Sequence, residues 1–122
     1  MEHKIQRFTD LIAWQNAHQL ALQIYQLTKE FPIDERFGLT NQMRRAAVSV
    51  SANIAEGFGR GTAKDKIQFY LIAVGSLSEV ESQLLIAKDL GYMKRNTKAT
   101  ETIFMVDKLL KGLIRSARGR TT

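Results

Sequence analysis

The sequence contains no cysteine among its 122 residues, which excludes disulfide bonds, thiolate metal sites and a cysteine nucleophile together. It has one proline and only 8% aromatic residues. The two histidines, His3 and His18, have no carboxylate at a metal-ligand spacing such as HExxH, so no metal site is indicated. No run of about 18 apolar residues is present, and the polar start MEHKIQRFTD lacks an apolar signal core. We therefore expect a cytoplasmic protein that has no membrane partner, no metal and no cofactor.

Enzymatic activity is not expected. The glycines in residues 57–61, GFGRG, follow a helical pattern rather than a strand, and the lysine and hydroxyl that end a P-loop are absent. Helical RNases of the HEPN type need an arginine shortly before a histidine, and neither histidine has one. Two of the carboxylates Glu56, Glu79 and Glu81 could serve as a general acid and a general base. However, nothing in the sequence supplies the nucleophile, metal or pocket that a reaction also needs. We expect a structural role for these carboxylates and no small-molecule substrate.

The chain is rich in helix-forming residues and shows no strand alternation bounded by turn signals. Apolar residues recur every three or four positions and predict helices at about 10–31, 37–58, 62–90 and 97–117. The connections between them are short, which favours antiparallel neighbours. We expect one domain, residues 1–122, with an all-α fold: an antiparallel up-and-down four-helix bundle.

The predicted helix ends have identifiable signals. Asp10 is a candidate N-cap of the first helix, and Pro32 stops that helix. Thr62 can cap the third helix, with Asp65 near its positive end. Asn96 is the cap candidate of the fourth helix.

The second helix combines two apolar sides with a polar line. The core stripe consists of Leu39, Met43, Ala46, Val50, Ile54 and Phe58. A second stripe of small side chains consists of Val48, Ala52 and Ala55. The polar line is Arg45, Ser49, Asn53, Glu56 and Arg60. Such a line either faces water or is hydrogen-bonded and fixes the register of packing.

The third helix also has two apolar stripes, although a bundle core needs only one from each helix. The expected core stripe is Ile67, Leu71, Val74, Leu77 and Leu84, and the second stripe is Phe69, Ile72, Ala73, Ser76, Val80 and Ala87. A glycine inside a helix costs about 1 kcal/mol relative to alanine, so a close helix contact at Gly75 is expected to compensate. The surplus faces either widen the core or form a subunit interface. The interface candidates are Ser49, Ala52, Asn53, Glu56, Arg60, Phe69, Ala73, Gly75 and Ser76.

The net charge of +6 lies entirely in the last part of the chain. Residues 1–87 contain nine basic and nine acidic residues, whereas residues 88–122 contain nine basic and three acidic ones. This pattern predicts a phosphate-binding surface. The alternative is a solvated basic face whose charges interact favourably with the dipole at the C-terminus of the fourth helix. The nucleic-acid-binding candidates are Lys94, Arg95, Lys98, Lys108, Lys111, Arg115, Arg118 and Arg120. The only aromatic residues there, Tyr92 and Phe104, suggest binding dominated by backbone charge.

The chain resembles the bacterial 23S rRNA intervening-sequence protein family over nearly its whole length. The matching pieces are Phe8, Asp10, Leu11, Ala13 and Trp14, then FPIDERFGL at 31–39, the 42–57 segment and IAVGSLSEV at 72–80. The resemblance implies a four-helix bundle that assembles as a homopentamer. It also implies a relation to the basic accessory proteins of diversity-generating retroelements, which bind nucleic acid and a reverse transcriptase. Ser51 stands where the family has a proline, which removes a kink or leaves a hydroxyl to bond backward along the helix.

These observations lead to two functional hypotheses. The first is a non-enzymatic homo-oligomer, ring-like and pentameric, whose basic surface binds the backbone of RNA or DNA. The alternative is a structural assembly protein that binds a protein partner, such as a nucleic-acid enzyme, without contacting nucleic acid itself.

Overall fold

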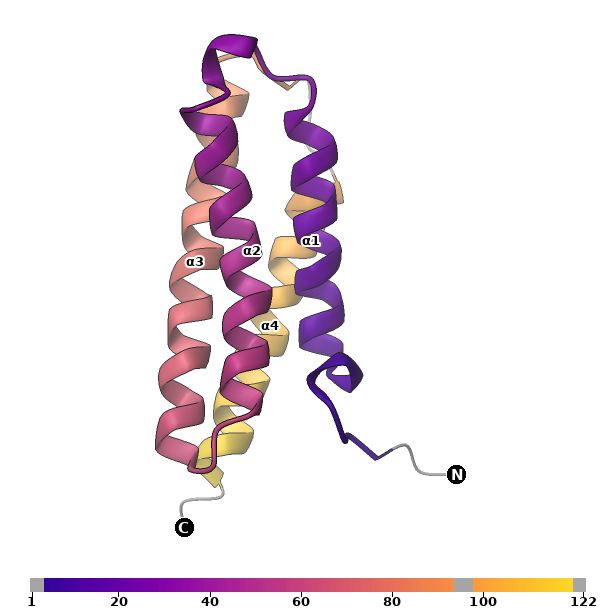
Figure 1. Ribbon diagram of the computed structural model, residues 1–122, viewed down its shortest axis with the longest axis vertical. Helices are drawn as coiled ribbons and strands as arrows, with labels where there is room; N and C mark the ends of the chain where they lie inside the picture. Colours follow the sequence, from indigo (N-terminus) through magenta and orange to yellow (C-terminus); the bar gives the residue numbers. More distant parts are fainter. Residues whose placement is uncertain (1–3, 94–97, 120–122) are drawn as a thin grey trace.

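The computed structural model describes residues 4–93 and 98–119 and consists mainly of four long helices (Figure 1). They are α1 (Ile12–Thr28), α2 (Leu39–Phe58), α3 (Ala63–Asp89) and α4 (Lys98–Gly119), and the short 3-10 helices η1 (Phe8–Asp10) and η2 (Ile33–Glu35) flank α1. Within the described residues no strand is present. Successive helices run in opposite directions, so the predicted all-α antiparallel bundle is confirmed.

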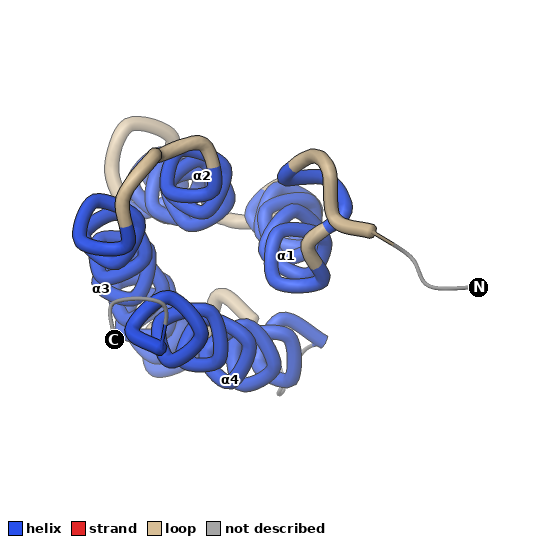
Figure 2. Tube along the Cα trace, turned by 90° about the horizontal axis from the view of Figure 1, so that it is seen from below, coloured by secondary structure: helices blue, strands red, loops and turns tan. Residues whose placement is uncertain are grey.

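The four helices stand at the corners of a square. In the end view of Figure 2, α1 packs against α2 and α4, and α3 packs against the same two helices from the opposite corner. Each helix therefore buries one stripe and leaves an outward face. The largest fully buried side chains are Leu20, Ile24, Met43, Val50, Ile54, Val80, Val106 and Leu110.

The core stripe of α2 was predicted correctly: Met43, Val50 and Ile54 are completely buried. At the position where the family proline was expected, the Ser51 hydroxyl donates to the carbonyl of Val48 at 3.2 Å. α2 runs without interruption through this position. Of the two effects expected for Ser51, the hydrogen bond from its hydroxyl back along the helix is therefore observed.

The prediction for α3 needs a correction, because its two stripes were partly interchanged. Ala73, Val80 and Ala87 are completely buried in the core, although they were assigned to the second stripe. Leu71 was assigned to the core and is 48% exposed. α3 is apolar around most of its circumference, so spacing does not distinguish the buried side from the exposed one.

The helix ends agree with the sequence in one case and differ in another. The Thr62 hydroxyl accepts a hydrogen bond from the Asp65 N–H at 3.2 Å and caps α3 as expected. Asp10 does not cap α1, because it ends η1, and its carboxylate accepts the N–H groups of Gln6 and Arg7 instead. Asn96 lies outside the described residues.

α3 is, by length and composition, apolar enough to cross a membrane, and only 33% of its most apolar window is buried inside the bundle. A core helix of a soluble protein can pass the same test. Ile72 is 45% exposed and Ile86 is 46% exposed. These exposures show that α3 has an outward apolar face that residues 4–93 and 98–119 do not cover.

Candidate functional surfaces

The cations of α4 form one exposed face of the bundle. Lys108, Lys111, Arg115 and Arg118 are all exposed, and their spacing of three or four residues keeps them on one side of the helix. Lys98 is exposed at the start of α4, ten residues before Lys108. The remaining candidates, Lys94, Arg95 and Arg120, lie outside the described residues.

Within this face the cations differ in their partners. Lys111 Nζ lies 2.8 Å from Asp107 Oδ2 one turn away, so a carboxylate already offsets part of its charge. Lys108 and Arg115 make no ion pair within residues 4–93 and 98–119. A phosphate that binds these two side chains therefore does not have to compete with a carboxylate of the described residues.

The two aromatic candidates have opposite environments. Phe104 is 63% exposed and lies one turn before Lys108 on the same side of α4. Tyr92 is half-buried, and its ring packs against Phe31 with centroids 5.4 Å apart. Only Phe104 is thus available to a ligand on the α4 face.

The Tyr92 hydroxyl belongs to a structural contact between η2 and the start of the connection after α3. It donates to Glu35 Oε2 at 2.7 Å, and Glu35 Oε1 accepts the Leu39 N–H at 3.1 Å. The hydrogen bond from Tyr92 lowers the pKa of Glu35, and the Leu39 N–H lowers it further. The same bond raises the pKa of Tyr92. This contact joins residues far apart in the sequence, and no local pattern could have predicted it.

The polar line of α2 faces α3 inside the protomer. The hydroxyls of Ser49 and Ser76 are 2.8 Å apart, and Asn53 Nδ2 donates to the carbonyl and the hydroxyl of Ser49 at 2.8 and 3.0 Å. Ser49, Asn53 and Ser76 are half-buried. The bond between the two serine hydroxyls joins α2 to α3, and Asn53 supports Ser49 from within α2.

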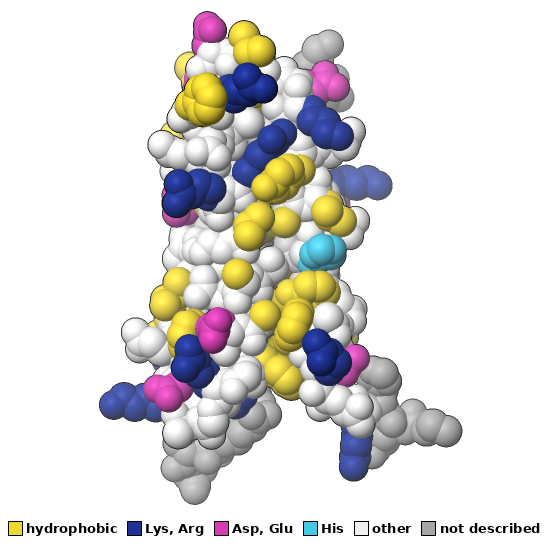
Figure 3. Space-filling view, viewed as in Figure 1, with side chains coloured by type: hydrophobic (Ala, Val, Ile, Leu, Met, Phe, Trp, Pro, Cys, Tyr) yellow, Lys and Arg dark blue, Asp and Glu magenta, His cyan; other side chains and the backbone are white. Residues whose placement is uncertain are grey.

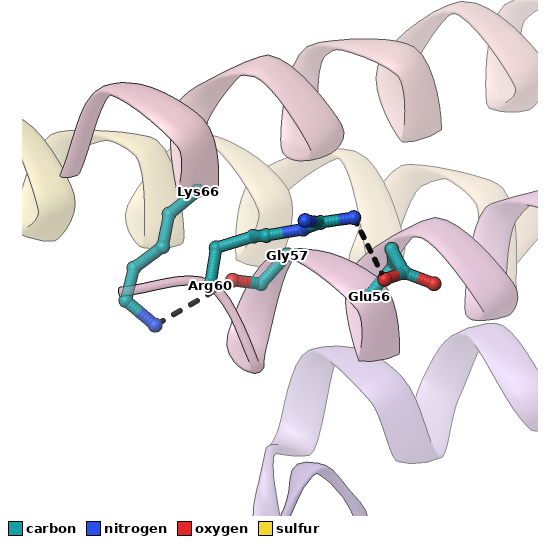
Figure 4. A network of polar contacts seen from close by, with 4 residues as sticks. All are labelled: Glu56, Gly57, Arg60 and Lys66. Atoms are coloured by element: carbon teal, nitrogen blue, oxygen red, sulfur yellow. Dashed lines mark hydrogen bonds and ion pairs between the residues drawn. The ribbon is translucent and has the colours of Figure 1, made fainter. Parts of the chain in front are cut away.

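The turn between α2 and α3 is tied together by two cations, as Figure 4 shows. Arg60 Nη2 bonds Glu56 Oε2 at 3.0 Å, and its guanidinium lies 4.5 Å from the centroid of the Phe69 ring. Lys66 Nζ donates to the carbonyl oxygens of Phe58 at 2.6 Å and Gly57 at 3.5 Å. Lys66 thus places a positive charge at the C-terminus of α2, where the helix dipole favours it.

The interface candidates fall into two groups. Ala73 is completely buried in the core of the bundle, whereas its assignment to an interface requires exposure. Ala52 and Gly75 are exposed, and a Cβ built on Gly75 would have no atom within 4 Å. The close helix contact expected at Gly75 is therefore not formed within the protomer, and its surroundings are open to another chain.

A hollow of about 340 Å³ follows the seam between α2 and α3. Arg45 and Ser49 line it from α2, and Ser76 and Glu79 from α3. Arg45 and Glu79 place opposite charges on its two sides.

The seam between α1 and α2 carries exposed apolar side chains, of which the sequence analysis singled out only Val48. Figure 3 shows hydrophobic side chains gathered along it. Leu22 is 51% exposed, Tyr25 is 42% exposed and Val48 is 43% exposed. Arg44 covers Tyr25, with its guanidinium 4.6 Å from the ring centroid. The signal in the sequence was the stripe that begins at Val48.

The residues considered for catalysis do not converge. His18 is exposed and stacks on Trp14 at 4.8 Å. Glu79 Oε2 accepts a bond from Gln83 Nε2 at 3.3 Å. No group of three or more histidine, aspartate or glutamate side chains suitable for a metal ion occurs in the part of the chain that the structure describes.

Comparisons with known proteins agree with this architecture. The family model described as 23S rRNA-intervening sequence protein matches residues 9–115. A crystal structure of a protein of unknown function from the S23 ribosomal protein family of Bacteroides thetaiotaomicron superimposes with a TM-score of 0.78 at 23% identity. The match covers 85% of this chain and 96% of that chain, and at this identity it shows the fold. A search of curated proteins finds no match.

Proposed function

The chain belongs to the 23S rRNA-intervening sequence protein family, and we propose that it is a non-enzymatic, cytoplasmic nucleic-acid-binding protein that works as a ring-like homopentamer. The observation that carries this proposal is the exposed basic face of α4. The proposed ligand is the phosphate backbone of RNA or DNA. The family description names 23S rRNA, so a 23S rRNA fragment is the first probe to use.

The α4 face suits a phosphate backbone because it is exposed and because two of its cations, Lys108 and Arg115, make no ion pair among the described residues. Neutralising each phosphate releases counterions, so binding should weaken steeply as salt rises, with a log–log slope of about −0.7 to −0.9 per phosphate. In a ring every protomer presents the same face, and several weak contacts then act together. Phe104, the one exposed aromatic residue on this face, adds little stacking, so sequence selectivity should be small.

The test is a low-salt mobility shift with a 23S rRNA fragment. In the α4 variant four residues become Gln together: Lys108, Lys111, Arg115 and Arg118. The control variant loses the same charge from four exposed residues elsewhere: Lys29, Arg36, Lys64 and Lys88. We expect the α4 variant to lose retention and the control to keep most of it. Equal RNA binding by both variants would contradict the assignment of nucleic-acid binding to α4.

The proposed subunit contact uses the outward faces of α2 and α3. Its support is the exposed apolar surface of α3, the open backbone at Gly75 and the small, exposed side chain of Ala52 on α2. Ala52→Arg and Gly75→Arg should each give smaller particles in light scattering, because a long charged side chain blocks close packing. Gln19→Arg on the exposed side of α1 is the matched control. An unchanged particle size for the first two variants would show that the contact lies elsewhere.

A protein partner is the second candidate. The observation that favours it is a groove between α1 and α4 in which apolar side chains lie beside two cations.

A further inference from the structure

A groove of about 810 Å³ runs between the start of α1 and the C-terminal half of α4. The two helices lie side by side along this edge of the bundle (Figure 2). Leu11 and Leu113 line the groove, and Ile12 at its border is 61% exposed. The groove is therefore an apolar surface that the described part of the protomer leaves uncovered.

Gly112 lines this groove from the interior of α4. A Cβ built there would meet only Arg115 Nη2, at 4.0 Å, so packing within the protomer does not require a glycine. Glycine weakens a helix relative to alanine. Its effect here is to leave the α4 backbone accessible at the groove, which allows another helix to approach closely.

Two cations stand on either side of Gly112. Lys108 and Arg115 both line the groove, and neither has an ion-pair partner among the residues that the structure describes. They are seven residues apart on α4, which is about 10.5 Å along the helix axis. A helix lying along α4 would reach both of them with carboxylates that are also seven residues apart.

The shape and chemistry of the groove select among occupants. It is open along its length, so it would not enclose a small molecule as ligand pockets do. Asp10 also lines the groove, but its carboxylate already accepts the N–H groups of Gln6 and Arg7. The apolar side chains between the two cations offer no hydrogen bond to a phosphate backbone. An amphipathic helix buries its apolar side in such a groove and keeps its charged side at the border.

We propose that this groove is a docking site for an acidic amphipathic helix of a protein partner. The partner helix carries apolar side chains toward Leu11 and Leu113 and two carboxylates at i and i+7 for Lys108 and Arg115. This inference does not require the proposed nucleic-acid binding. Because Lys108 and Arg115 belong to both surfaces, the helix and a nucleic acid would compete for α4.

The probe is a fluorescein-labelled synthetic 18-residue helix of leucine, alanine, glutamine and glutamate, with leucines on one side and two glutamates at i and i+7. A peptide with lysines in place of the glutamates tests charge, and one with the same composition in scrambled order tests the apolar face. Binding to the 122-residue protein is followed by fluorescence anisotropy. The variants are Gly112→Leu, which fills the groove without changing charge, and the control Gly112→Ala.

We expect micromolar binding of the acidic peptide, at least tenfold weaker binding of both control peptides, and competition by the 23S rRNA fragment. Gly112→Leu should weaken peptide binding at least tenfold but leave RNA retention unchanged, whereas Gly112→Ala, which adds a single methyl group, should weaken peptide binding much less. Lys108→Gln should weaken peptide binding up to about fivefold, as expected for a partly exposed ion pair.

Three results would overturn the proposal: no binding of the acidic peptide, equal binding of the lysine peptide, or unchanged binding by Gly112→Leu. A smaller particle for Gly112→Leu, together with no peptide binding to the wild type, would instead assign the groove to a contact between copies of this chain. Loss of RNA retention by the wild type would refute the proposed nucleic-acid function and leave the peptide result to be judged separately.

Discussion

Gly57→Ala should destabilise the bundle, although alanine is the better helix former. A Cβ at residue 57 would lie 2.7 Å from Tyr70 Cε1 and 3.1 Å from Phe69 Cβ. Real Cβ atoms essentially never approach another atom within 3.0 Å. Tyr70 is only 3% exposed, so its ring cannot swing aside, and Phe69 Cβ moves only with the backbone of α3. α2 and α3 would have to separate locally.

The expected magnitude follows from two opposing terms. Overpacking of this kind costs about 1–3 kcal/mol. The gain in helix propensity is at most about 1 kcal/mol, and it is smaller here because Gly57 is the second-last residue of α2. We therefore expect a net loss of about 1–2 kcal/mol, which lowers the Tm by roughly 4 °C per kcal/mol for a chain of this size.

The assay is thermal and urea denaturation at one fixed protomer concentration, because assembly would make the Tm depend on concentration. Gly112→Ala is the control, since its Cβ meets only one atom, at 4.0 Å, and the substitution should stabilise the protein by up to about 1 kcal/mol. The two changes are chemically identical and should have opposite signs. If Gly57→Ala is as stable as the wild type, close packing of Tyr70 on α2 is not what keeps this glycine.

Three other perturbations test the contacts that hold the helices in register. Ser49→Ala should lower the free energy of unfolding by about 0.5–1.5 kcal/mol. A double-mutant cycle with Ser76→Ala, measured by denaturation, should show coupling, and additive effects would contradict the hydrogen bond between the two hydroxyls. The lowered pKa of Glu35 stabilises the fold above the unfolded-state carboxyl pKa, and this stabilisation should be lost as the pH falls through the folded pKa. Tyr92→Phe should flatten that acid limb of the stability profile, and an unchanged limb would contradict the assignment. Lys66→Met removes the cation at the C-terminus of α2 and should cost about 0.3–1 kcal/mol by urea denaturation; no loss would show that the carbonyl contacts are energetically neutral.

The sequence predicted the helices well because each buries a periodic apolar stripe. The positions of Met43, Val50 and Ile54 follow from that spacing alone. The cap at Thr62 is a local signal and was also predictable. Asp10 carried a similar signal but lies in η1, one residue too early for the cap of α1, because an additional short helix precedes it.

What the sequence did not predict depends on which surfaces meet in three dimensions. Ala73 and Leu71 exchange their expected environments, since α3 is apolar on most sides and only its neighbours decide which side is buried. The bond between Glu35 and Tyr92 joins residues that are 57 positions apart. The groove at Gly112 forms only when the end of α4 lies beside the start of α1.

The exposed cations of α4 were predicted from charge, but their different partners were not. Lys111 lies beside Asp107 in the structure, whereas Lys108 and Arg115 do not have an ion pair in residues 4–93 and 98–119. Within the basic face, the structure therefore identifies Lys108 and Arg115 as the two side chains whose charge is not offset by an ion pair in the described residues. The same two side chains border the groove, so α4 is where both proposals can be tested together.

The most direct test of the central proposal is light scattering of the purified protein with a 23S rRNA fragment at low and high salt. We predict a particle of five times the 13.8 kDa protomer mass without RNA, a heavier complex at low salt, and the free particle again at high salt. A particle of protomer mass that does not associate with RNA at low salt would contradict both the assembly and the function.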